Sequence, residues 1–119
     1  MIILKFGGTS VSTRERLEII CRIVTEEKER QPILVVSAIR GVTDLLLSLP
    51  SISHNERKNI FSQIQQLHSK LLATYDDSLQ QQVLPFIEQC EREMTKILSS
   101  KKKSSELADA VVSYGEIMS

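Results

Sequence analysis

A lysine, two glycines and two hydroxyl residues follow one another near the start of the sequence, in Lys5-Phe6-Gly7-Gly8-Thr9-Ser10. Glycines let a backbone approach a phosphate closely, a helix N-terminus offers unpaired N–H groups, and the lysine adds a positive charge. The spacing fits neither the P-loop nor the dinucleotide-binding pattern. The segment is therefore a candidate anion-binding loop, although a tight strand-to-helix turn with an exposed lysine would explain the same residues.

A second segment with hydroxyl groups follows an apolar run. It reads Ser37-Ala38-Ile39-Arg40-Gly41-Val42-Thr43-Asp44. Its small and hydroxylic residues could line a site that faces Lys5. A strand that ends at Ser37 and a helix capped by Thr43 or Asp44 would need no ligand, and this segment alone favours that simpler interpretation.

A third segment, Tyr114-Gly115-Glu116, places a glycine and a carboxylate inside an otherwise apolar helical pattern. Packing alone does not readily explain these two residues, and an exposed helix end would explain them equally well. The third segment is therefore a candidate for the same site.

The cysteines and histidines are too widely spaced for a disulfide framework or a zinc site. Cys21 and Cys90 lie far apart in helix-like patterns without a C-x-x-C, and His54 and His68 are the only histidines. We therefore expect two buried free thiols and no protein metal site, and we assign no chemistry to the histidines.

A strand–helix–strand unit must hold the first two segments. Ile2 to Phe6 is an apolar run ended by two glycines, and residues 33–36 are continuously apolar, as in a parallel strand covered on both faces. Between them, Ser12-x-x-Glu15 is a capping box before a helical pattern. Because about 26 residues separate the runs, the sequence predicts a right-handed parallel βαβ crossover. Ligands bind at the carboxyl ends of such strands.

Helical patterns fill the rest of the chain. Residues 44–49 predict a short helix ended by Pro50, and Ser53-x-x-Glu56 is a capping box before a long helix. After a break at residues 76–78, a second long pattern can pack antiparallel on the first, and Pro85 either kinks it or begins a new helix. The apolar stripes comprise Ile60, Phe61, Ile64, Leu67, His68, Leu71, Leu72 and Tyr75 on the first helix, and Leu79, Val83, Phe86, Cys90, Met94 and Ile97 on the second.

The last helical pattern follows a charged linker, residues 101–105, and Ser105 can cap it. The pattern stops at Ser119 within an apolar stretch and without a helix-ending residue. Two parallel strands also make a poor independent sheet. We therefore expect the chain to be the N-terminal part of a larger α/β domain and, through its exposed strand edges, to self-associate.

Composition excludes several classes of function. The chain has 119 residues, which fits one domain or part of one, and its 15 basic and 15 acidic residues cancel. A net charge of zero argues against unspecific nucleic-acid or membrane-surface binding, and five aromatic residues without tryptophan are too few for a base-stacking platform.

The sequence also lacks the patterns of membrane insertion and secretion. No apolar stretch approaches the roughly 18 residues that a membrane span needs, and the N-terminus does not have the pattern of a secretory signal. We expect a cytoplasmic protein without nucleic-acid or membrane partners.

Taken together, the three segments resemble the first three motif blocks of aspartokinases, in the right order, within the amino-acid kinase superfamily. The quoted residues are Lys5-Phe6-Gly7-Gly8-Thr9-Ser10-Val11, Val35-Val36-Ser37-Ala38 with Gly41 and Thr43, and Ser113-Tyr114-Gly115-Glu116-Ile117-Met118-Ser119. The resemblance spans the whole chain, and the first block is highly specific. Ile39-Arg40 departs from it, because many relatives have small residues there.

The resemblance implies an amino-acid-kinase αβα sandwich with a largely helical insertion. It implies transfer of a phosphoryl group from ATP, with Mg²⁺, to the side-chain carboxylate of L-aspartate. In this pattern Lys5, Gly7, Gly8 and Ser10 contact phosphate, with Lys5 as the catalytic residue. In the same pattern Ser37, Thr43 and Glu116 form the aspartate-binding site. Glu116 holds the aspartate amino group or orients Lys5.

The resemblance also implies a division of the chain: a phosphate- and substrate-binding βαβ unit over residues 1–44, a helical hairpin insertion over 45–104, and the start of a helix over 105–119. The nucleotide-base site, a substrate-clamping arginine and regulatory domains follow the third block in the family, so these residues alone are expected to be inactive. The full-length protein is expected to be a homo-oligomer. Two rivals are another amino-acid kinase and a non-catalytic module that uses the hairpin to bind a partner helix.

Overall fold

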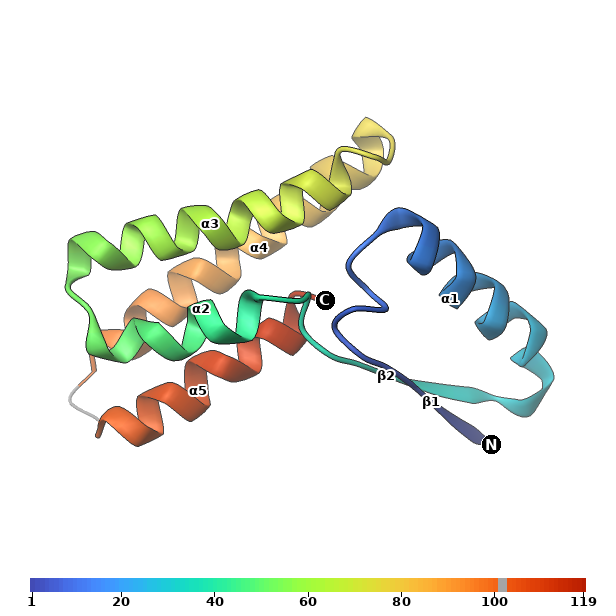
Figure 1. Cartoon of the computed structure of the whole chain (residues 1–119), viewed down its shortest axis with the longest axis horizontal. Coiled ribbons are helices and arrows are strands. Elements are labelled where there is room, and N and C mark those ends of the chain that lie inside the picture. Colours follow the sequence, from blue (N-terminus) through green and yellow to red (C-terminus); the bar gives the residue numbers. More distant parts are fainter. Residues whose placement is uncertain (101–102) are drawn as a thin grey trace.

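The computed structural model describes residues 1–100 and 103–119 (Figure 1). Its elements along the chain are β1 (Ile2–Phe6), α1 (Arg14–Glu26), the 3₁₀ turn η1 (Lys28–Arg30), β2 (Pro32–Val36), α2 (Val42–Ser48), the 3₁₀ turn η2 (Leu49–Ser51), α3 (His54–Leu72), α4 (Asp77–Leu98) and α5 (Ser104–Ile117). Figure 1 shows two parts joined side by side: β1, β2 and α1 form one, and α2 to α5 form a helical bundle.

The predicted parallel βαβ unit is confirmed. β1 and β2 pair in parallel, in a register that runs from Ile2 opposite Pro32 to Phe6 opposite Val36. The chain between them passes through α1, which lies along one side of the strands (Figure 1). Both strands therefore end at the same edge, where the bundle begins.

The prediction that the second strand is covered on both faces is wrong for the described part of the chain. Ile33, Leu34 and Val35 are 48%, 45% and 43% exposed, and Ile3 on the neighbouring strand is 65% exposed. The physical reason is that only α1 packs on this two-stranded sheet. The continuously apolar pattern of β2 predicts more cover than residues 1–100 and 103–119 supply.

The start of α1 differs from the predicted capping box. The N-cap is Thr13, whose hydroxyl accepts a hydrogen bond from the Arg16 backbone N–H at 3.4 Å. Ser12 lies one residue outside the helix and bonds elsewhere. Serine and threonine are both preferred N-cap residues, so local preference does not distinguish Ser12 from Thr13. Thr13 caps the helix because the Ser12 hydroxyl is used in contacts outside it.

The predicted helical hairpin is confirmed as α3 and α4, which run antiparallel (Figure 1). Ser53 and Glu56 form the expected capping box, with the Ser53 N–H donating to Glu56 Oε2 at 2.8 Å. Pro85 lies inside α4, so it does not begin a new helix.

The buried stripe of α4 differs from the predicted one after the proline. Ile87, Cys90, Met94 and Leu98 are buried, whereas the predicted Phe86 is 44% exposed. The stripe of α3 runs through Phe61, Ile64, His68 and Leu72. Cys90 is buried as expected, and the expectation for Cys21 is wrong because its side chain is exposed.

Two other helices begin earlier than the sequence predicts. α2 starts at Val42 rather than Asp44, because Gly41 occupies the N-cap position. α5 starts at Ser104 with Lys103 at its cap, so Ser105 does not cap it. Lys101 and Lys102 of the expected linker lie outside the described residues.

The core of the bundle lies where α2, η2 and α5 meet, and Val42, Leu46, Leu49 and Val111 are fully buried there. This core fixes α5 against the start of α2 and so against the end of β2. Among the described residues, no helix has the length and apolar character to cross a membrane.

Candidate functional site

The two strand ends are joined directly beyond the sheet. The backbone N–H of Ser37 donates to the carbonyl of Phe6 at 3.0 Å, which continues the ladder by one residue. The glycine loop that follows β1 and the loop that follows β2 therefore start side by side. This is the edge where open α/β sheets bind their ligands.

Close packing requires Gly8 to be a glycine. A Cβ at this position would lie 2.5 Å from the carbonyl oxygen of Ala38, which is far inside contact distance. A Cβ at Gly7 would meet nothing within 4 Å. Packing thus explains Gly8, whereas Gly7 leaves open space beside the loop backbone.

The glycine loop turns tightly and keeps hydrogen-bond donors free. Ser10 and Val11 donate their N–H groups to the Gly7 carbonyl, at 2.8 and 3.3 Å. The N–H groups of Gly8 and Thr9 have no acceptor among the described residues. Two unused donors in one turn give this loop the capacity to hold an anion.

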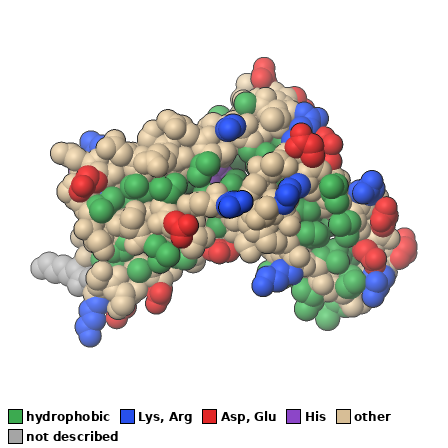
Figure 2. Space-filling model, in the orientation of Figure 1, with side chains coloured by type: hydrophobic (Ala, Val, Ile, Leu, Met, Phe, Trp, Pro, Cys, Tyr) green, Lys and Arg blue, Asp and Glu red, His purple; other side chains and the backbone are tan. Residues whose placement is uncertain are grey.

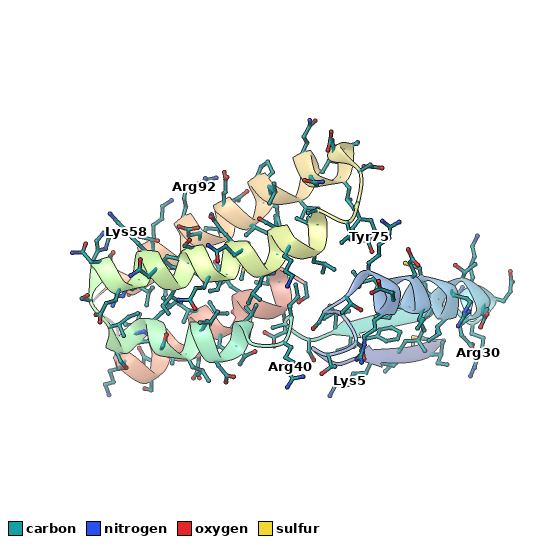
Figure 3. The ribbon with its side chains drawn as sticks, turned by 45° about the horizontal axis from the view of Figure 1, so that its top comes forward. Lys5, Arg30, Arg40, Lys58, Tyr75 and Arg92 are labelled. Atoms are coloured by element: carbon teal, nitrogen blue, oxygen red, sulfur yellow. The ribbon has the colours of Figure 1, made fainter. Side chains whose placement is uncertain are left out.

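Lys5 lies at the same edge and is exposed (Figure 3). The two ion pairs of the described residues are Arg14–Glu18 and Arg30–Glu27, so Lys5 has no ionic partner within them. Its charge is therefore available to a ligand. Ser10 is half-buried and lines a pocket beside α1 with Phe6 and Arg16.

Ser12 connects the two loops, a role that the sequence reasoning missed. Its hydroxyl donates to the Gly8 carbonyl and accepts a 3.3 Å hydrogen bond from the Arg40 backbone N–H. The neighbouring Thr13 is an equally good helix cap, and a helix needs only one N-cap residue. The presence of two adjacent hydroxyl residues could therefore have indicated that one of them forms hydrogen bonds elsewhere.

The loop after β2 turns into α2 through Gly41, which has a φ of 91°. L-residues with a Cβ rarely adopt this conformation, so glycine is required. Thr43 and Asp44 lie inside the first turn of α2, and neither caps it. The simpler interpretation of these two residues as helix caps is wrong. Ser37 and Thr43 are both half-buried.

The third segment packs against the second through Gly115. A Cβ there would lie 2.9 Å from Ala38 Cβ and 3.2 Å from Leu46 Cδ1. Close packing therefore explains this glycine, contrary to the interpretation as an exposed helix end. Glu116 beside it is exposed and has no ionic partner among the described residues.

Tyr114 ties this segment to the hairpin, because its hydroxyl donates to Glu93 Oε2 at 2.9 Å. Hydrogen bonds from Gln89 and from Tyr114 hold the pKa of Glu93 below its usual value. This hydrogen bond therefore links α5 to α4.

Ala38 is the point at which the three segments meet. Its carbonyl contacts Gly8, and its methyl group contacts Gly115. Lys5 and Arg40 lie at the junction between sheet and bundle (Figure 3). The structure thus brings the strand ends and the end of α5 together, without a direct ion pair between Lys5 and Glu116. In the described ranges, no three histidine, cysteine or acidic side chains cluster as metal ligands.

Comparison with known proteins agrees with this arrangement. The model of the amino acid kinase family matches residues 1–119. The chain therefore belongs to the amino acid kinase family. Within that family its relatives are aspartokinases, and it resembles their N-terminal part.

The aspartokinase of Chlamydia pneumoniae is 41% identical over 71 residues, which are 60% of this chain and 16% of that protein. Aspartokinase 1 of Arabidopsis thaliana, a chloroplastic protein, is 27% identical over 125 residues, covering 98% of this chain and 21% of the relative. This chain thus matches only 16–21% of the length of these relatives.

Solved structures give the same result. Escherichia coli aspartokinase III in complex with lysine and aspartate, in the T-state, superposes with a TM-score of 0.82 at 26% identity. The R-state complex with aspartate and ADP gives a TM-score of 0.77 at 27% identity. Each superposition covers 99% of this chain and 26% of the solved one.

Proposed function

We propose that residues 1–119 belong to an aspartate kinase, which transfers the γ-phosphoryl group of ATP to the side-chain carboxylate of L-aspartate and yields 4-phospho-L-aspartate. This is the first step of lysine, threonine, methionine and diaminopimelate biosynthesis. The observation that carries the proposal is the meeting of three motif segments at Ala38, at the ligand-binding edge of a parallel sheet. The aspartokinase relatives supply the substrate class.

The phosphate side of the site is assigned to the first segment. Lys5 contacts the oxygens of the transferred phosphoryl group and offsets their charge, and it is the catalytic residue. The backbone N–H groups of Gly7 and Gly8 donate to phosphate, and Ser10 assists. These roles are supported by two features of the described residues: Lys5 is exposed without an ionic partner among them, and the Gly8 N–H has no acceptor among them.

The aspartate side of the site is assigned to the other two segments. Ser37 and Thr43 bind the substrate, and Glu116 holds its amino group or orients Lys5. An aspartate side chain has a pKa of about 3.9 and is ionised at neutral pH, so it needs no general base. Positioning and charge neutralisation are then the main tasks of these residues.

Magnesium is assigned to the nucleotide phosphates. A kinase metal is commonly bound through substrate phosphates and one or two carboxylates rather than an all-protein cage. We propose no metal ligand in residues 1–119, and the free donors of the glycine loop fit phosphate oxygens rather than a cation.

The proposed division is a βαβ phosphate- and substrate-binding unit over residues 1–44, a helical hairpin insertion over 45–104, and the start of a longer helix over 105–119. The full-length protein is proposed to be a cytoplasmic homo-oligomer. The nucleotide-base site and the arginine that clamps the substrate carboxylate are assigned to other parts of that protein.

The test is formation of aspartyl phosphate from ATP, trapped with hydroxylamine. The assay compares the 119-residue chain with the full natural gene product that contains it, each with L-aspartate and with L-glutamate. We expect activity with aspartate in the gene product and none in the isolated chain. Activity with glutamate alone would assign the chain to a sister amino-acid kinase. No activity in a folded gene product with magnesium would contradict the kinase proposal.

A further inference from the structure

An open groove of about 400 Å³ crosses the junction between the βαβ unit and the helical bundle. Residues 12–15 line it at the start of α1, residues 39–40 line it after β2, and four residues between positions 67 and 74 line it at the end of α3. A volume of this size lies within the range of small-molecule sites, roughly 300–1,000 Å³. The groove lies beside the candidate site, because none of the proposed phosphate- or aspartate-binding residues lines it.

The charged side chains around this groove are mostly basic. Arg14, Arg40 and Lys70 line it, and Glu15 is the one acidic side chain among its described lining residues. Figure 2 shows basic side chains on the surface around the hollow between the two parts. Because the whole chain carries no net charge, this positive excess is local and does not follow from the composition.

Arg14 is already engaged within the protein. Its Nε donates to Glu18 Oε1 at 2.8 Å. Another guanidinium nitrogen donates to the Thr74 carbonyl, and the group lies 5.0 Å from the centroid of the Tyr75 ring. The charge of Arg14 is therefore balanced by Glu18, and its side chain forms a wall of the groove.

Arg40 and Lys70 are the charges of the groove that remain available to a ligand. Both side chains are exposed, and neither has an ionic partner among the described residues. The Arg40 backbone is held in place, because its N–H donates to Ser12 Oγ at 3.3 Å and the following Gly41 has a φ of 91°. An arginine anchored in this way can form the paired hydrogen bonds that a carboxylate or phosphate accepts.

The apolar side chains of the groove favour a ligand with an apolar body. Ile39 is 7% exposed, and Leu67 and Leu71 are half-buried beside it. We propose that the groove binds an organic anion, with an apolar ring or branched body against these three side chains and a carboxylate or phosphate group that pairs with Arg40 and Lys70. The proposal does not depend on the proposed kinase function.

A matched pair of probes, 4-fluorophenylacetate and 4-fluorophenylacetamide, tests this proposal. The two have nearly the same shape, but only the acetate is charged. Ligand-observed fluorine NMR on the full natural gene product, at neutral pH and low salt, should give an at least roughly tenfold lower Kd for the acetate, the value of one charge-assisted hydrogen bond. With 4-fluorophenyl phosphate as a third arm, tighter binding of either anion than of the amide supports the proposal and identifies the preferred anionic group.

The preference for the anion should fall in Arg40→Gln and in Lys70→Gln, and both variants should fold because the two side chains are exposed. It should persist in Lys58→Gln, a matched change at an exposed lysine of α3 outside the groove. It should also persist in Lys5→Gln, which tests whether the probe occupies the proposed phosphate site instead.

A measurement on the unmodified protein adds an independent check. Raising the salt concentration to about 0.5 M should reduce the preference for the anion, because salt screens charges that are open to water. Failure of all three probes to bind, or equal affinity for the anions and the amide, would overturn the proposal. A preference that is lost in Lys5→Gln but kept in Arg40→Gln and Lys70→Gln would also overturn it.

Discussion

Packing does not explain Lys5, near the end of β1, or Gly7, in the glycine loop that follows it. Gly8 is required by the Ala38 carbonyl, and Gly115 by the Ala38 methyl group, so both glycines would be needed in a protein without a ligand. Gly7 has open space on its Cβ side, and Lys5 is exposed without an ionic partner among the described residues. A role in ligand binding is therefore best tested at these two residues.

Replacing Lys5 with alanine should lower the kcat of the full gene product by at least roughly 10²- to 10³-fold, because one charged donor to the phosphoryl group is lost. Hydroxamate formation measures this. Lys58→Ala is the matched control, because Lys58 is an exposed lysine at the far end of α3 (Figure 3). A Lys5→Ala enzyme with near-normal kcat would remove Lys5 from the mechanism.

His68 should make the stability of the fold depend on pH. Burial lowers the pKa of His68 in the folded state below 6.5. Below pH 6.5 the unfolded chain therefore binds a proton that the folded chain does not, and the free energy of unfolding falls as the pH drops toward the lowered folded pKa. The loss is at most about 1.4 kcal/mol per pH unit.

Urea unfolding between pH 5 and 8 measures this dependence, at low protein concentration. His68→Leu should flatten the slope relative to the parent chain, whereas His54→Leu should keep it. Tyr75 and His68 line one pocket between α1 and the hairpin, but burial raises the pKa of the Tyr75 hydroxyl, so it stays protonated over this range. Identical slopes in the parent and in His68→Leu would show that His68 is not the titrating group.

At the scale of elements, Ala38 sets the distance between β1, β2 and α5. The loop after β1 touches its carbonyl, and α5 touches its methyl group through a glycine. Ser12 adds a second link, because its hydroxyl joins the glycine loop to the backbone of Arg40. The candidate site is thus held by close contacts between the backbone and short side chains of neighbouring elements, and its geometry depends on small residues at each contact.

Replacing Gly115 with alanine should destabilise the fold. The new Cβ would lie 2.9 Å from Ala38 Cβ, and overpacking of this kind costs about 1–3 kcal/mol, partly offset by about 1 kcal/mol of helix propensity. Adding Ala38→Gly removes the nearest contact and should recover part of the loss. Urea unfolding of both single variants and the double variant gives their coupling energy, and simple additivity would rule out a direct contact.

At the scale of the whole molecule, one face of the β1–β2 sheet has no cover within the described residues. Ile3, Ile33 and Val35 lie on this face, because residues in parallel register share a face and alternate along each strand. The bundle contacts the sheet only at its carboxyl edge (Figure 1). An apolar face and open strand edges together favour association with another chain.

The isolated 119-residue chain should therefore self-associate. Size-exclusion chromatography with light scattering should show a mass that rises with protein concentration. Ile33→Lys should restore the monomer by placing a charge on the sheet face. Leu47→Lys is the control, because Leu47 is 52% exposed on α2, away from the sheet. A compact monomer at every concentration would contradict this prediction.

Much of the local structure could be predicted from the sequence, because short-range patterns determine it. The spacing of the apolar residues predicts the two strands and the helical hairpin, and the residue types at the helix start predict the Ser53 capping box. Two of the errors fall where two local solutions have similar energies. Ser12 and Thr13 both cap helices well, and Phe86 and Ile87 both fit an apolar stripe beyond Pro85.

The sequence by itself determined the parallel βαβ unit, the order of the three motif segments and their resemblance to aspartokinases. Only the tertiary structure decided that Gly8 and Gly115 are needed for contact with Ala38, that Ser12 joins two loops, and that His68 is buried. The physical reason is the distance along the chain over which each kind of interaction acts. Periodicity and capping act between residues a few positions apart, whereas these contacts join residues that are distant in the chain and adjacent only after the elements pack.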